Sequence, residues 1–487
     1  MEFEPVIGLE VHAELETKSK MFCACPVVDL TQAQPNIAVC PVCSGMPGAL
    51  PVINRKAVEY GLRVALALGC EISSLSLFAR KNYFYPDLPK GYQISQYEQP
   101  LARNGHLAIL TLQGERDIHI QRVHLEEDTG KLSHMNDEKE AYSLVDLNRA
   151  GIPLLEIVSE PDLRSAEEAR AYAMSLRSLL RYLGVNSGDM QKGVMRVEPN
   201  VSVRLVGSHE FGIRTEIKNL NSFRALERSV DYEIRRQIGL LQQGGIIKQE
   251  TRGWDENRGE TILQRAKEEA DDYRYFPEPD LPPLIVGNEW LERIRETLPE
   301  LPIAKYCRFQ SQYGLSAYDA GVLTAEFSVA DYFEHVIRAV PGAAPKVIAN
   351  WITGDLFGLL NQVGKSVEES HVTPQMLAGL IHMVVQGEIN QKTAKNVLAE
   401  VFETGKPVDE IVSERGLIQI SDTAVISNLV QRVLRENPEQ VAAFLGGKEG
   451  VARWLFGQVM RAALGRANPQ ILKSELERQL LELNPNR

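Results

Sequence analysis

The sequence has no apolar run that approaches the roughly 18 residues of a membrane-spanning helix, and its first residues include no basic segment of the kind that opens a signal peptide. Cysteine is scarce, with only six in 487 residues, so the chain is not a disulfide scaffold. The Gly-x-Gly-x-x-Gly motif of dinucleotide-binding proteins is absent. The segment from Gly358 to Ser366 is similar to a phosphate-binding loop, but it has five residues between its glycines where that loop needs four, and a predicted helix precedes it. These absences predict a cytoplasmic, folded, multidomain protein with no membrane segment.

Acidic residues outnumber basic ones, 65 Asp and Glu against 53 Lys and Arg, and the formal net charge is −12. This balance argues against indiscriminate nucleic-acid binding by the whole surface. The last 43 residues, from Leu445 to Arg487, have the opposite balance, with seven basic and four acidic side chains. A basic helical module at one end of the chain favours a local nucleic-acid contact, although an ordinary charged helical surface explains the same counts.

Two kinds of sequence pattern divide the chain. Before the prolines at 282–302, alternating runs predict half-buried strands and helical spacing predicts helices between them. The runs lie at 5–15, 118–128 and 200–205, and the helical segments at 57–68, 164–183 and 223–238. Beyond the prolines only helical periodicity continues. We therefore predict an α+β fold in which an N-terminal domain with an antiparallel sheet (1–292) precedes two all-α units (293–406 and 407–487).

Four of the cysteines form one cluster in the sequence. A Cys-x-Cys is followed, after fourteen residues, by a Cys-x-x-Cys, and each motif places two sulfurs on one tight turn. The four residues are Cys23, Cys25, Cys40 and Cys43. They predict a tetrahedral Zn²⁺ site that is structural, because four sulfurs leave no open coordination position. Two unrelated pairs, or a redox Cys-x-x-Cys, are the alternatives. Cys70 and Cys307 stand alone and are predicted to be small buried residues.

Charged and histidine side chains alternate with apolar ones in three segments. Residues two apart on a strand share a face, so each segment is expected to present one polar group away from the core. The groups are Glu10 with His12; His124 with Glu126 and Asp128; and Arg214 with Glu216 and Lys218. If these faces meet, they form an oxygen-rich site suited to Mg²⁺ or Mn²⁺, which phosphoryl transfer requires together with Lys or Arg. Spacing alone leaves open the alternative that all of them are solvent-facing residues of a sheet.

Aromatic residues interleave with cations in two segments, Arg80 to Asp87 and Tyr273 to Asp280. Such a pattern is typical of base stacking combined with a phosphate contact. A buried aromatic strand before a turn has the same composition. The pattern alone does not choose between the two.

Several longer motifs, taken together and in order, resemble one protein family. They are Val6 to His12, Arg80 to Asp87, Tyr92 to Gln96, His124 to Lys131, Asp146 to Leu154, Arg196 to Arg204, Thr215 to Ser222, Asp272 to Asp280, Gly457 to Met460 and Gly465 to Pro469. The family is the B subunit of the bacterial-type aspartyl/glutamyl-tRNA(Asn/Gln) amidotransferase, and the resemblance covers almost the whole chain. The segment from Arg453 to Phe456 is bulkier than the resemblance leads us to expect.

The resemblance implies a carbon–nitrogen ligase that takes its amide nitrogen from glutamine. Family members bind mischarged tRNA and ATP, and they phosphorylate the side-chain carboxylate of Glu-tRNA(Gln) or Asp-tRNA(Asn). Ammonia, released from glutamine by the amidase (A) subunit, arrives through a tunnel and displaces the phosphate, and a small C subunit completes the heterotrimer. The implied cofactors are ATP, Mg²⁺ or Mn²⁺, and a structural Zn²⁺. The implied fold is a kinase-like cradle domain with a helical tRNA-binding tail.

The resemblance also implies roles for individual residues. The residues expected to be catalytic are Glu10, His12, Glu126 and Lys81, and the first three are also expected to bind magnesium. Glu127 and Glu216 are expected to bind the cofactor. Tyr83, Arg461 and Arg466 are expected to contact the tRNA. A second hypothesis is a noncatalytic, zinc-containing RNA-binding scaffold, which would not need the acid and histidine set. The sequence does not decide whether the mischarged amino acid is Glu, Asp or both.

Overall fold

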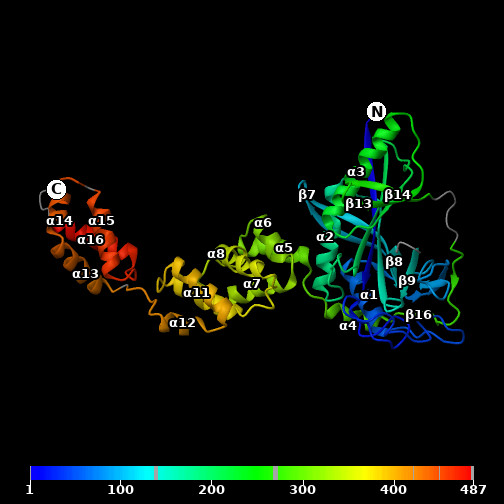
Figure 1. The fold of residues 1–487 in the computed structure, drawn as a ribbon, viewed down its shortest axis with the longest axis horizontal. Helices are drawn as coiled ribbons and strands as arrows, with labels where there is room; N and C mark the ends of the chain where they lie inside the picture. Colours follow the sequence, from blue (N-terminus) through cyan, green and yellow to red (C-terminus); the bar gives the residue numbers. More distant parts are fainter. Residues whose placement is uncertain (1, 137–140, 267–272, 421, 449, 484–487) are drawn as a thin grey trace. The chain divides into compact units, whose positions relative to one another are not determined.

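The computed structural model describes residues 2–136, 141–266, 273–420, 422–448 and 450–483. The chain divides into two compact units, Met1–Lys305 and Tyr306–Arg487 (Figure 1). The first unit contains the large sheet and the second is helical, which confirms the predicted α+β fold with an all-α C-terminal region. Two residues of the tail charge count, Glu449 and Arg487, lie outside the described residues. In the described ranges, no helix has the length and apolarity that a bilayer crossing requires.

A nine-stranded sheet is the framework of the first unit. In spatial order its strands are β14 (Glu260–Ala266), β13 (Glu250–Asp255), β12 (Thr215–Lys218), β11 (Met195–Leu205), β1 (Phe3–Glu14), β10 (Pro153–Ser159), β7 (Gly114–Glu127), β6 (Ala102–Thr111) and β2 (Glu71–Ile72). Among these strands, neighbours run antiparallel except β12 and β13, which run parallel. The predicted fully antiparallel sheet is wrong at this pair. A long helix, α3 (Phe223–Gln242), connects the two strands and provides the crossover that a parallel pair needs.

Three helices cover one face of this sheet (Figure 1). They are α1 (Arg55–Ala67), α2 (Ala166–Tyr182) and α3. Each begins after an Asn or Ser whose side chain accepts a hydrogen bond from the first turn. Val11, Leu125 and Ile217 point from the sheet into the hydrophobic core that these helices complete. Because side chains alternate along a strand, the residues next to them face the other way.

Smaller sheets lie at the edges of the first unit. They are β15 (Phe276–Pro277) with β4 (Ala79–Asn82) and β5 (Tyr92–Ser95); β16 (Leu284–Ile285) with β3 (Leu75–Ser76); and β8 (Lys131–Asn136) with β9 (Ala141–Asp146). Helix α4 (Asn288–Glu296) follows β16 in the chain. Phe276 pairs with Arg80 across the first of them. The two aromatic segments of the sequence therefore lie side by side.

The second unit consists of helices in its described part. They are α5 (Pro302–Tyr313), which begins in the first unit, α6 (Ala317–Thr324), α7 (Phe327–Ala339), α8 (Pro345–Asn350), the π-helical η1 (Trp351–Leu356), α9 (Phe357–Val363), α10 (Pro374–Val385), α11 (Gln391–Thr404), α12 (Val408–Glu414), α13 (Thr423–Glu436), α14 (Pro438–Leu445), α15 (Val451–Ala462) and α16 (Pro469–Glu482). The residues before Gly364 are helical, in line with our rejection of a phosphate-binding loop. One hydrophobic core runs from Phe309 to Val412 and a second from Ile426 to Leu480. We propose that these cores mark two all-α domains.

The two isolated cysteines have different surroundings. Cys70 is buried, as predicted, but Cys307 is exposed. Helix α5 buries Lys305 and Phe309. Cys307 is two residues from each, about 200° around the helix, so it faces solvent and the prediction of a buried thiol is wrong there.

Tyr172 on helix α2 is fully buried, and its hydroxyl has no hydrogen-bond partner among the described residues. An unsatisfied buried hydroxyl is unfavourable, so Tyr172→Phe is expected to raise the free energy of unfolding by about 1 kcal/mol. The midpoint of urea unfolding of the full chain, followed by circular dichroism, measures this change. Tyr332 is the matched control, because its hydroxyl donates to the carbonyl of Val372 at 3.0 Å, and Tyr332→Phe is expected to lower stability. Equal destabilisation by both variants would contradict the assignment.

Candidate active site

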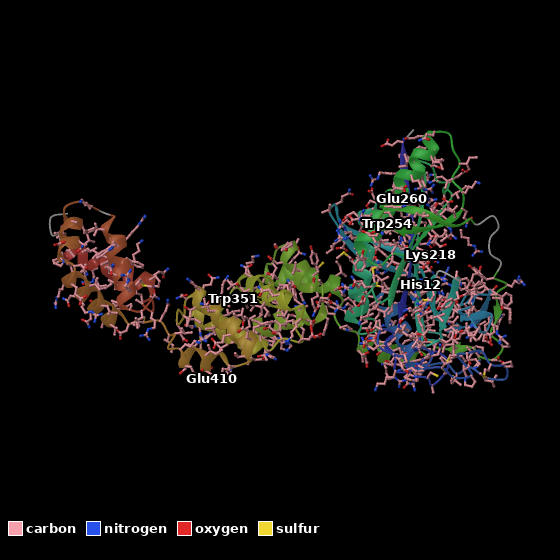
Figure 2. All side chains as sticks on the ribbon, viewed as in Figure 1. His12, Lys218, Trp254, Glu260, Trp351 and Glu410 are labelled. Carbon is pink, nitrogen blue, oxygen red and sulfur yellow. The ribbon has the colours of Figure 1, made fainter. Side chains whose placement is uncertain are left out.

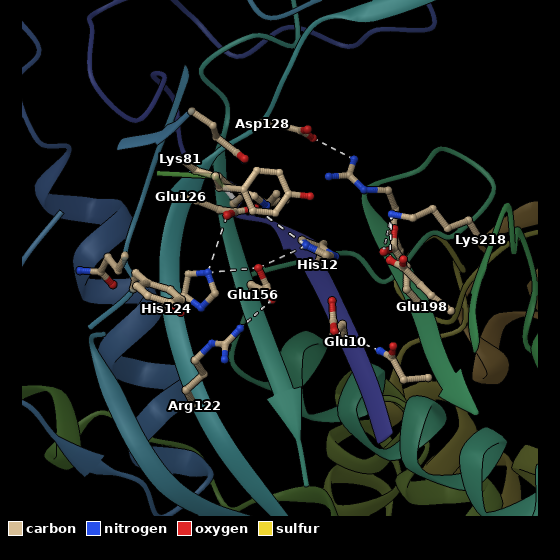
Figure 3. A pocket seen from close by; sticks show the side chains of 18 of the residues that line it. Glu10, His12, Lys81, Arg122, His124, Glu126, Asp128, Glu156, Glu198 and Lys218 are labelled. Atoms are coloured by element: carbon tan, nitrogen blue, oxygen red, sulfur yellow. Dashed lines mark hydrogen bonds and ion pairs between the residues drawn. The ribbon is translucent and has the colours of Figure 1, made fainter. Parts of the chain in front are cut away.

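A pocket of about 570 Å³ lies on the face of the nine-stranded sheet opposite the helices (Figure 3). Strands β1, β7, β10, β11 and β12 contribute its polar side chains. The three polar faces expected from sequence all line it: Glu10 and His12; His124, Glu126 and Asp128; Arg214, Glu216 and Lys218. His12 and Lys218 mark its position within the first unit in Figure 2. The structure thus brings together residues that spacing alone left scattered over three strands.

Strand register explains why these side chains meet. His12 on β1 is opposite Glu156 on β10, and Glu156 is opposite His124 on β7. On the other side of β1, Glu10 is opposite Glu198 on β11. Directly opposed residues of neighbouring strands share a face and lie close together. The backbone pairing therefore fixes a row of acids and histidines across the sheet.

His12, Glu126 and Glu156 form the first group of possible metal ligands, with one ligand atom from each lying within 4.8 Å of the others. Nε2 of His12 is 3.4 Å from Glu156 Oε2 and 3.8 Å from Glu126 Oε1. Nε2 of His124 is 3.1 Å from the same Glu156 oxygen. Both histidines have a buried Nδ1 atom without a hydrogen-bond partner among the described residues. Such unpaired buried polar atoms are unusual, and they indicate a site that a bound species completes.

Glu10, Glu198 and Glu216 form a second group of carboxylates, again with one oxygen from each within 4.8 Å of the others. The amide of Asn200 donates to Glu10 Oε1 at 3.0 Å. The Lys218 ammonium lies 2.9 Å from Glu198 Oε2 and 3.2 Å from Glu216 Oε1 (Figure 3). The Asn200 amide and the Lys218 ammonium therefore help to hold the cluster, and the hydroxyl of Thr251 donates to Glu216 Oε2 at 2.9 Å.

The predicted magnesium ligands fall into these two groups. His12 and Glu126 belong to the first group and Glu10 to the second. Carboxylate oxygens with an imidazole nitrogen suit Mg²⁺ or Mn²⁺. Two neighbouring ligand groups also suit a pair of divalent cations, an arrangement that enzymes use in phosphoryl transfer. The donor set therefore fits the predicted ion.

The pKa values of the site reflect its crowded charges. Burial, together with the charges of Glu156 and Glu198, raises the pKa of Glu10. Burial alone would raise the pKa of Glu156, but the charges of His124 and His12 hold it well below its ordinary value. Burial lowers the pKa of His12, but its hydrogen bond to Glu156 and the nearby carboxylates outweigh burial and raise the pKa to about 9. Without a metal, His12 is therefore an imidazolium ion among carboxylates at neutral pH.

Two further cations contribute to the pocket wall. Lys81 on β4 lies with its ammonium 5.0 Å from the centre of the Tyr273 ring. Burial opposes the charge of Lys81, but Glu126 and other neighbours outweigh burial and raise its pKa. Arg196 lies 2.8 Å from Asp128, whose pKa it lowers against the effect of burial to about 2. Buried carboxylates therefore stabilise both positive charges, Arg196 by a direct ion pair and Lys81 by the nearby charge of Glu126.

The aromatic segments divide between structure and site. Arg80 points away from the pocket and binds both oxygens of Glu278, at 2.7 and 2.8 Å. Tyr83 is half-buried and contacts Tyr273 edge to face, with 6.1 Å between ring centres, but it is not among the residues that line the pocket. The neighbouring Lys81 does line it. One cation of the motif is therefore structural and the other belongs to the site.

Glu127 does not reach the pocket, although the resemblance implied a cofactor contact. Its carboxylate pairs with Lys90 and accepts a hydrogen bond from the backbone N–H of Ile94 at 2.9 Å. Adjacent strand residues point to opposite faces, so Glu126 and Glu127 cannot both line one pocket. We therefore correct this prediction and assign Glu127 a structural contact.

Sequence reasoning missed two acids of the site, Glu156 and Glu198. Strand β10 is buried along its whole length, so no alternation surrounds Glu156. The one indication of a functional role for Glu156 was its position as a charged residue in the middle of an otherwise apolar strand. Glu198 continues the alternation of the predicted strand 200–205 toward the N-terminus, since β11 begins at Met195. An earlier start for that strand would have placed Glu198 on the same face as Asn200.

The four clustered cysteines also meet in the structure. One sulfur from each lies within 4.8 Å of the others, with 3.8 Å between Cys40 and Cys43 and 4.0 Å between Cys25 and Cys43. Tetrahedral Zn²⁺ with bonds of about 2.3 Å separates its sulfurs by about 3.8 Å. A hydrogen bond from Cys23 lowers the pKa of Cys43, with Cys40 and Lys20 adding to the shift. The four cysteines could therefore hold a zinc ion.

The two tail arginines expected to contact tRNA differ in their surroundings. Arg461 is exposed near the end of α15. Arg466 is half-buried and donates to the carbonyl of Gly416 at 3.3 Å. Arg461 is therefore available to a partner, whereas Arg466 also supports the fold of the second unit.

Two domain families match the sequence: the GatB/GatE catalytic domain over residues 5–292 and the GatB domain over residues 331–480. The chain belongs to the GatB/GatE family. It is 53% identical over 480 residues to the aspartyl/glutamyl-tRNA(Asn/Gln) amidotransferase B subunit of Moorella thermoacetica, covering 99% of this chain and 100% of that one. The corresponding B subunit of Thermodesulfovibrio yellowstonii is 51% identical over 484 residues, with 99% and 100% covered. These matches confirm the resemblance found in the motifs and place the chain in an enzyme family, with the pocket inside the catalytic domain.

The electrostatics of His12 give a test of the site. In metal-free protein His12 is expected to titrate near pH 9, because Glu156 stabilises its proton. Since the folded pKa exceeds the unfolded value of about 6.5, the stabilising contribution is full below pH 6.5 and is lost as pH rises through 9. A histidine-selective NMR titration, with His12→Gln to assign the signal, measures the pKa. Titration near pH 6.5 would contradict the arrangement described above.

The cysteine cluster gives a second test. The full chain, purified without chelator, is expected to contain one equivalent of zinc by elemental analysis, because four thiolates fill its coordination sphere. Cys43→Ser is expected to remove most of that zinc, while Cys70→Ala, which changes a buried cysteine outside the cluster, should retain it. Full zinc content in Cys43→Ser would show that the ion is held elsewhere.

Proposed function

We propose that this chain is the tRNA-binding, ATP-using component of an amidotransferase that converts Glu-tRNA(Gln), Asp-tRNA(Asn) or both into Gln-tRNA(Gln) and Asn-tRNA(Asn). The observation that carries the proposal is the pocket itself. It sets two groups of metal-ligating side chains beside Lys81, Arg196 and Lys218 in a family of amidotransferase subunits. Phosphoryl transfer needs this combination, because its charges must be neutralised and its reactants positioned.

The chemistry requires activation because a carboxylate is a poor electrophile. In the first step, a side-chain carboxylate oxygen of the aminoacyl-tRNA attacks the γ-phosphorus of ATP, and the bond from this phosphorus to the β,γ-bridging oxygen breaks, giving an acyl phosphate and ADP. In the second step, the nitrogen of ammonia attacks the acyl carbon, and the bond from this carbon to the phosphate oxygen breaks. Phosphate leaves, and the surplus proton of the nitrogen passes to a base.

The pocket supplies a group for each need. Glu10, Glu198 and Glu216 on one side, and His12, Glu126 and Glu156 on the other, would hold the metal ions. Mg²⁺ or Mn²⁺ bound there would neutralise the polyphosphate and polarise the γ-phosphate.

Other side chains bind and orient the reacting groups and the metal ligands. Lys81 is placed to stabilise the phosphate charge, and Lys218 to orient the carboxylates of the second group. Glu126 is buried and receives a hydrogen bond from Ser95 at 3.0 Å, which orients this carboxylate as a ligand of the first group. Ammonia must reach this point as neutral NH₃, because only the unprotonated nitrogen has the lone pair that attacks the acyl carbon.

Substrate and partners extend beyond the pocket. We propose that Tyr83, close to Tyr273, contacts the acceptor end of the tRNA, and that Arg461 and Arg466 contact its backbone through the tail. The relatives are named as the B component of their enzymes, which implies further subunits. We propose a cytoplasmic heterotrimer with an amidase (A) subunit, which releases ammonia from glutamine, and a small C subunit.

A noncatalytic RNA-binding scaffold is the competing hypothesis. A scaffold gains nothing from a buried row of carboxylates and histidines, whose mutual repulsion and burial are unfavourable. Glu126, Glu156 and His124 are all nearly inaccessible to solvent. The pocket therefore favours a catalytic role for this chain.

Removal of a metal ligand tests the catalytic proposal. In the assembled complex, Glu10→Ala and His12→Ala are each expected to reduce tRNA-dependent ATP cleavage and amide formation by at least about 100-fold, because charge stabilisation in the transition state is lost. Glutaminase turnover by the partner should remain. Glu115→Ala, which removes an exposed carboxylate from β7, is the matched control and should leave all three rates unchanged. Amide formation retained by Glu10→Ala and His12→Ala would exclude the assignment.

A further inference from the structure

Lys20 is a fully buried lysine, with 0% of its surface exposed. It follows β1 in the chain, and its ammonium nitrogen makes three contacts. It lies 2.7 Å from the carbonyl of Ala38, 3.1 Å from the carbonyl of Leu147 and 3.6 Å from the sulfur of Cys43. A lysine ammonium has three N–H donors, so these contacts use all of them. The side chain is therefore held in one position.

The charge of Lys20 needs an anion. Within the described ranges no carboxylate forms an ion pair with Lys20, and the nearby Glu127 is paired with Lys90. A buried ammonium without a counter-charge is strongly unfavourable, and protein interiors pair such groups or bind metal sites with them. The only anion that its contacts offer is the thiolate of Cys43.

The cysteine cluster matches this need. Zn²⁺ with four thiolates has a net charge of −2, and Cys43, the cysteine that Lys20 contacts, is the buried member of the cluster, whereas the other three are partly exposed. We propose that Lys20 is the counter-cation of the four-cysteine zinc site and the positioning residue that orients Cys43 as a ligand. It does not bind the metal. It donates to a ligand, as the partners of metal ligands outside the coordination sphere commonly do.

Lys20 also joins the cysteine cluster to the pocket end of the sheet. The segment 36–38 of the cluster is hydrogen-bonded to 146–148: Ala38 N–H donates to Asn148 Oδ1 at 2.9 Å, and Leu147 N–H donates to Asn36 Oδ1 at 2.8 Å. Asn36 N–H also donates to Asp146 Oδ1 at 3.0 Å, and Lys20 adds a bond to the carbonyl of Leu147.

From there the chain continues to the pocket wall. The N–H of Gly151 donates to the carbonyl of Asp128 at 2.9 Å, and its carbonyl accepts from the N–H of Met21 at 2.7 Å. Asp128 in turn binds Arg196 in the pocket. The zinc site thus supports the segment 146–151, which positions Asp128 at one end of the pocket. Lys20 contacts both the zinc site and this segment.

Zinc affinity tests the proposal directly. Lys20→Met keeps the length and apolar stem of the side chain but removes its charge. In chelator competition with the full chain, this variant is expected to bind zinc at least tenfold more weakly than wild type, within the 10–100-fold range typical of lost partners of metal ligands. Lys18→Met is the matched control, because Lys18 is exposed two residues away, and it should bind zinc like wild type. Equal zinc affinity of Lys20→Met and wild type would overturn the proposal.

A second measurement distinguishes a counter-cation from a residue that merely packs. In the wild-type background, Lys20→Met should lower the urea midpoint of the zinc-loaded chain. In a background with Cys40→Ser and Cys43→Ser, which removes the anion, Lys20→Met should raise the midpoint, because an uncompensated buried charge is then deleted. A lower midpoint in both backgrounds would show a packing role and would refute the proposal. If Lys20→Met fails to fold in the wild-type background, the comparison of the Cys40→Ser/Cys43→Ser protein with and without Lys20→Met still distinguishes the two roles.

Discussion

The two-residue period of four adjacent strands is the constraint on which the rest of this structure depends. On β1, β7 and β11 the same alternation that sends Val11, Leu125 and Val197 into the core sends His12, Glu126 and Glu198 to the opposite face. The same strand register therefore determines which side chains form the core and which line the pocket. A slip of one residue would expose the apolar set and bury the acids under the helices, so hydrophobic burial also fixes the geometry of the polar pocket.

The pocket concentrates charges that repel one another, and this has a physical consequence for function. The raised pKa of Glu10 reports the crowding, and the raised pKa of His12 reports its partial relief by a proton. A rigid sheet can hold such a cluster because its backbone hydrogen bonds and core do not depend on the side chains of the opposite face. A bound cation would replace the proton and relieve the repulsion between the carboxylates. This relief would contribute favourable free energy to the binding of a divalent ion.

Within a strand, the sequence was a good guide to the site, and between strands it was not. Alternation placed Glu10 with His12 and His124 with Glu126 on common faces, as the structure has them. It carried no information on which strands are neighbours, and the resemblance to a family filled that gap. The resemblance led to an error at Glu127, although strand alternation places this residue on the face opposite Glu126. Alternation gave no signal at Glu156, because β10 is buried on both faces. The parallel β12–β13 pair could not be predicted either, but for a different reason: its direction depends on the crossover helix α3 and not on the strands' own residues.

A structural metal can support a reaction in which it takes no part, and the cysteine segment has the features of such a site. Between Cys23 and Val52 the chain forms no helix or extended strand, and Ile37, Leu50 and Val52 are exposed, so this segment has little core of its own. Small segments of this kind gain their order from metals or cross-links. Its contacts to 146–148 lie close in sequence to β10, which contributes Glu156 to the pocket. With a zinc ion bound, four thiolates and one buried lysine would add rigidity where a hydrophobic core is too thin to supply it, at the end of the sheet where the acids must be held in register.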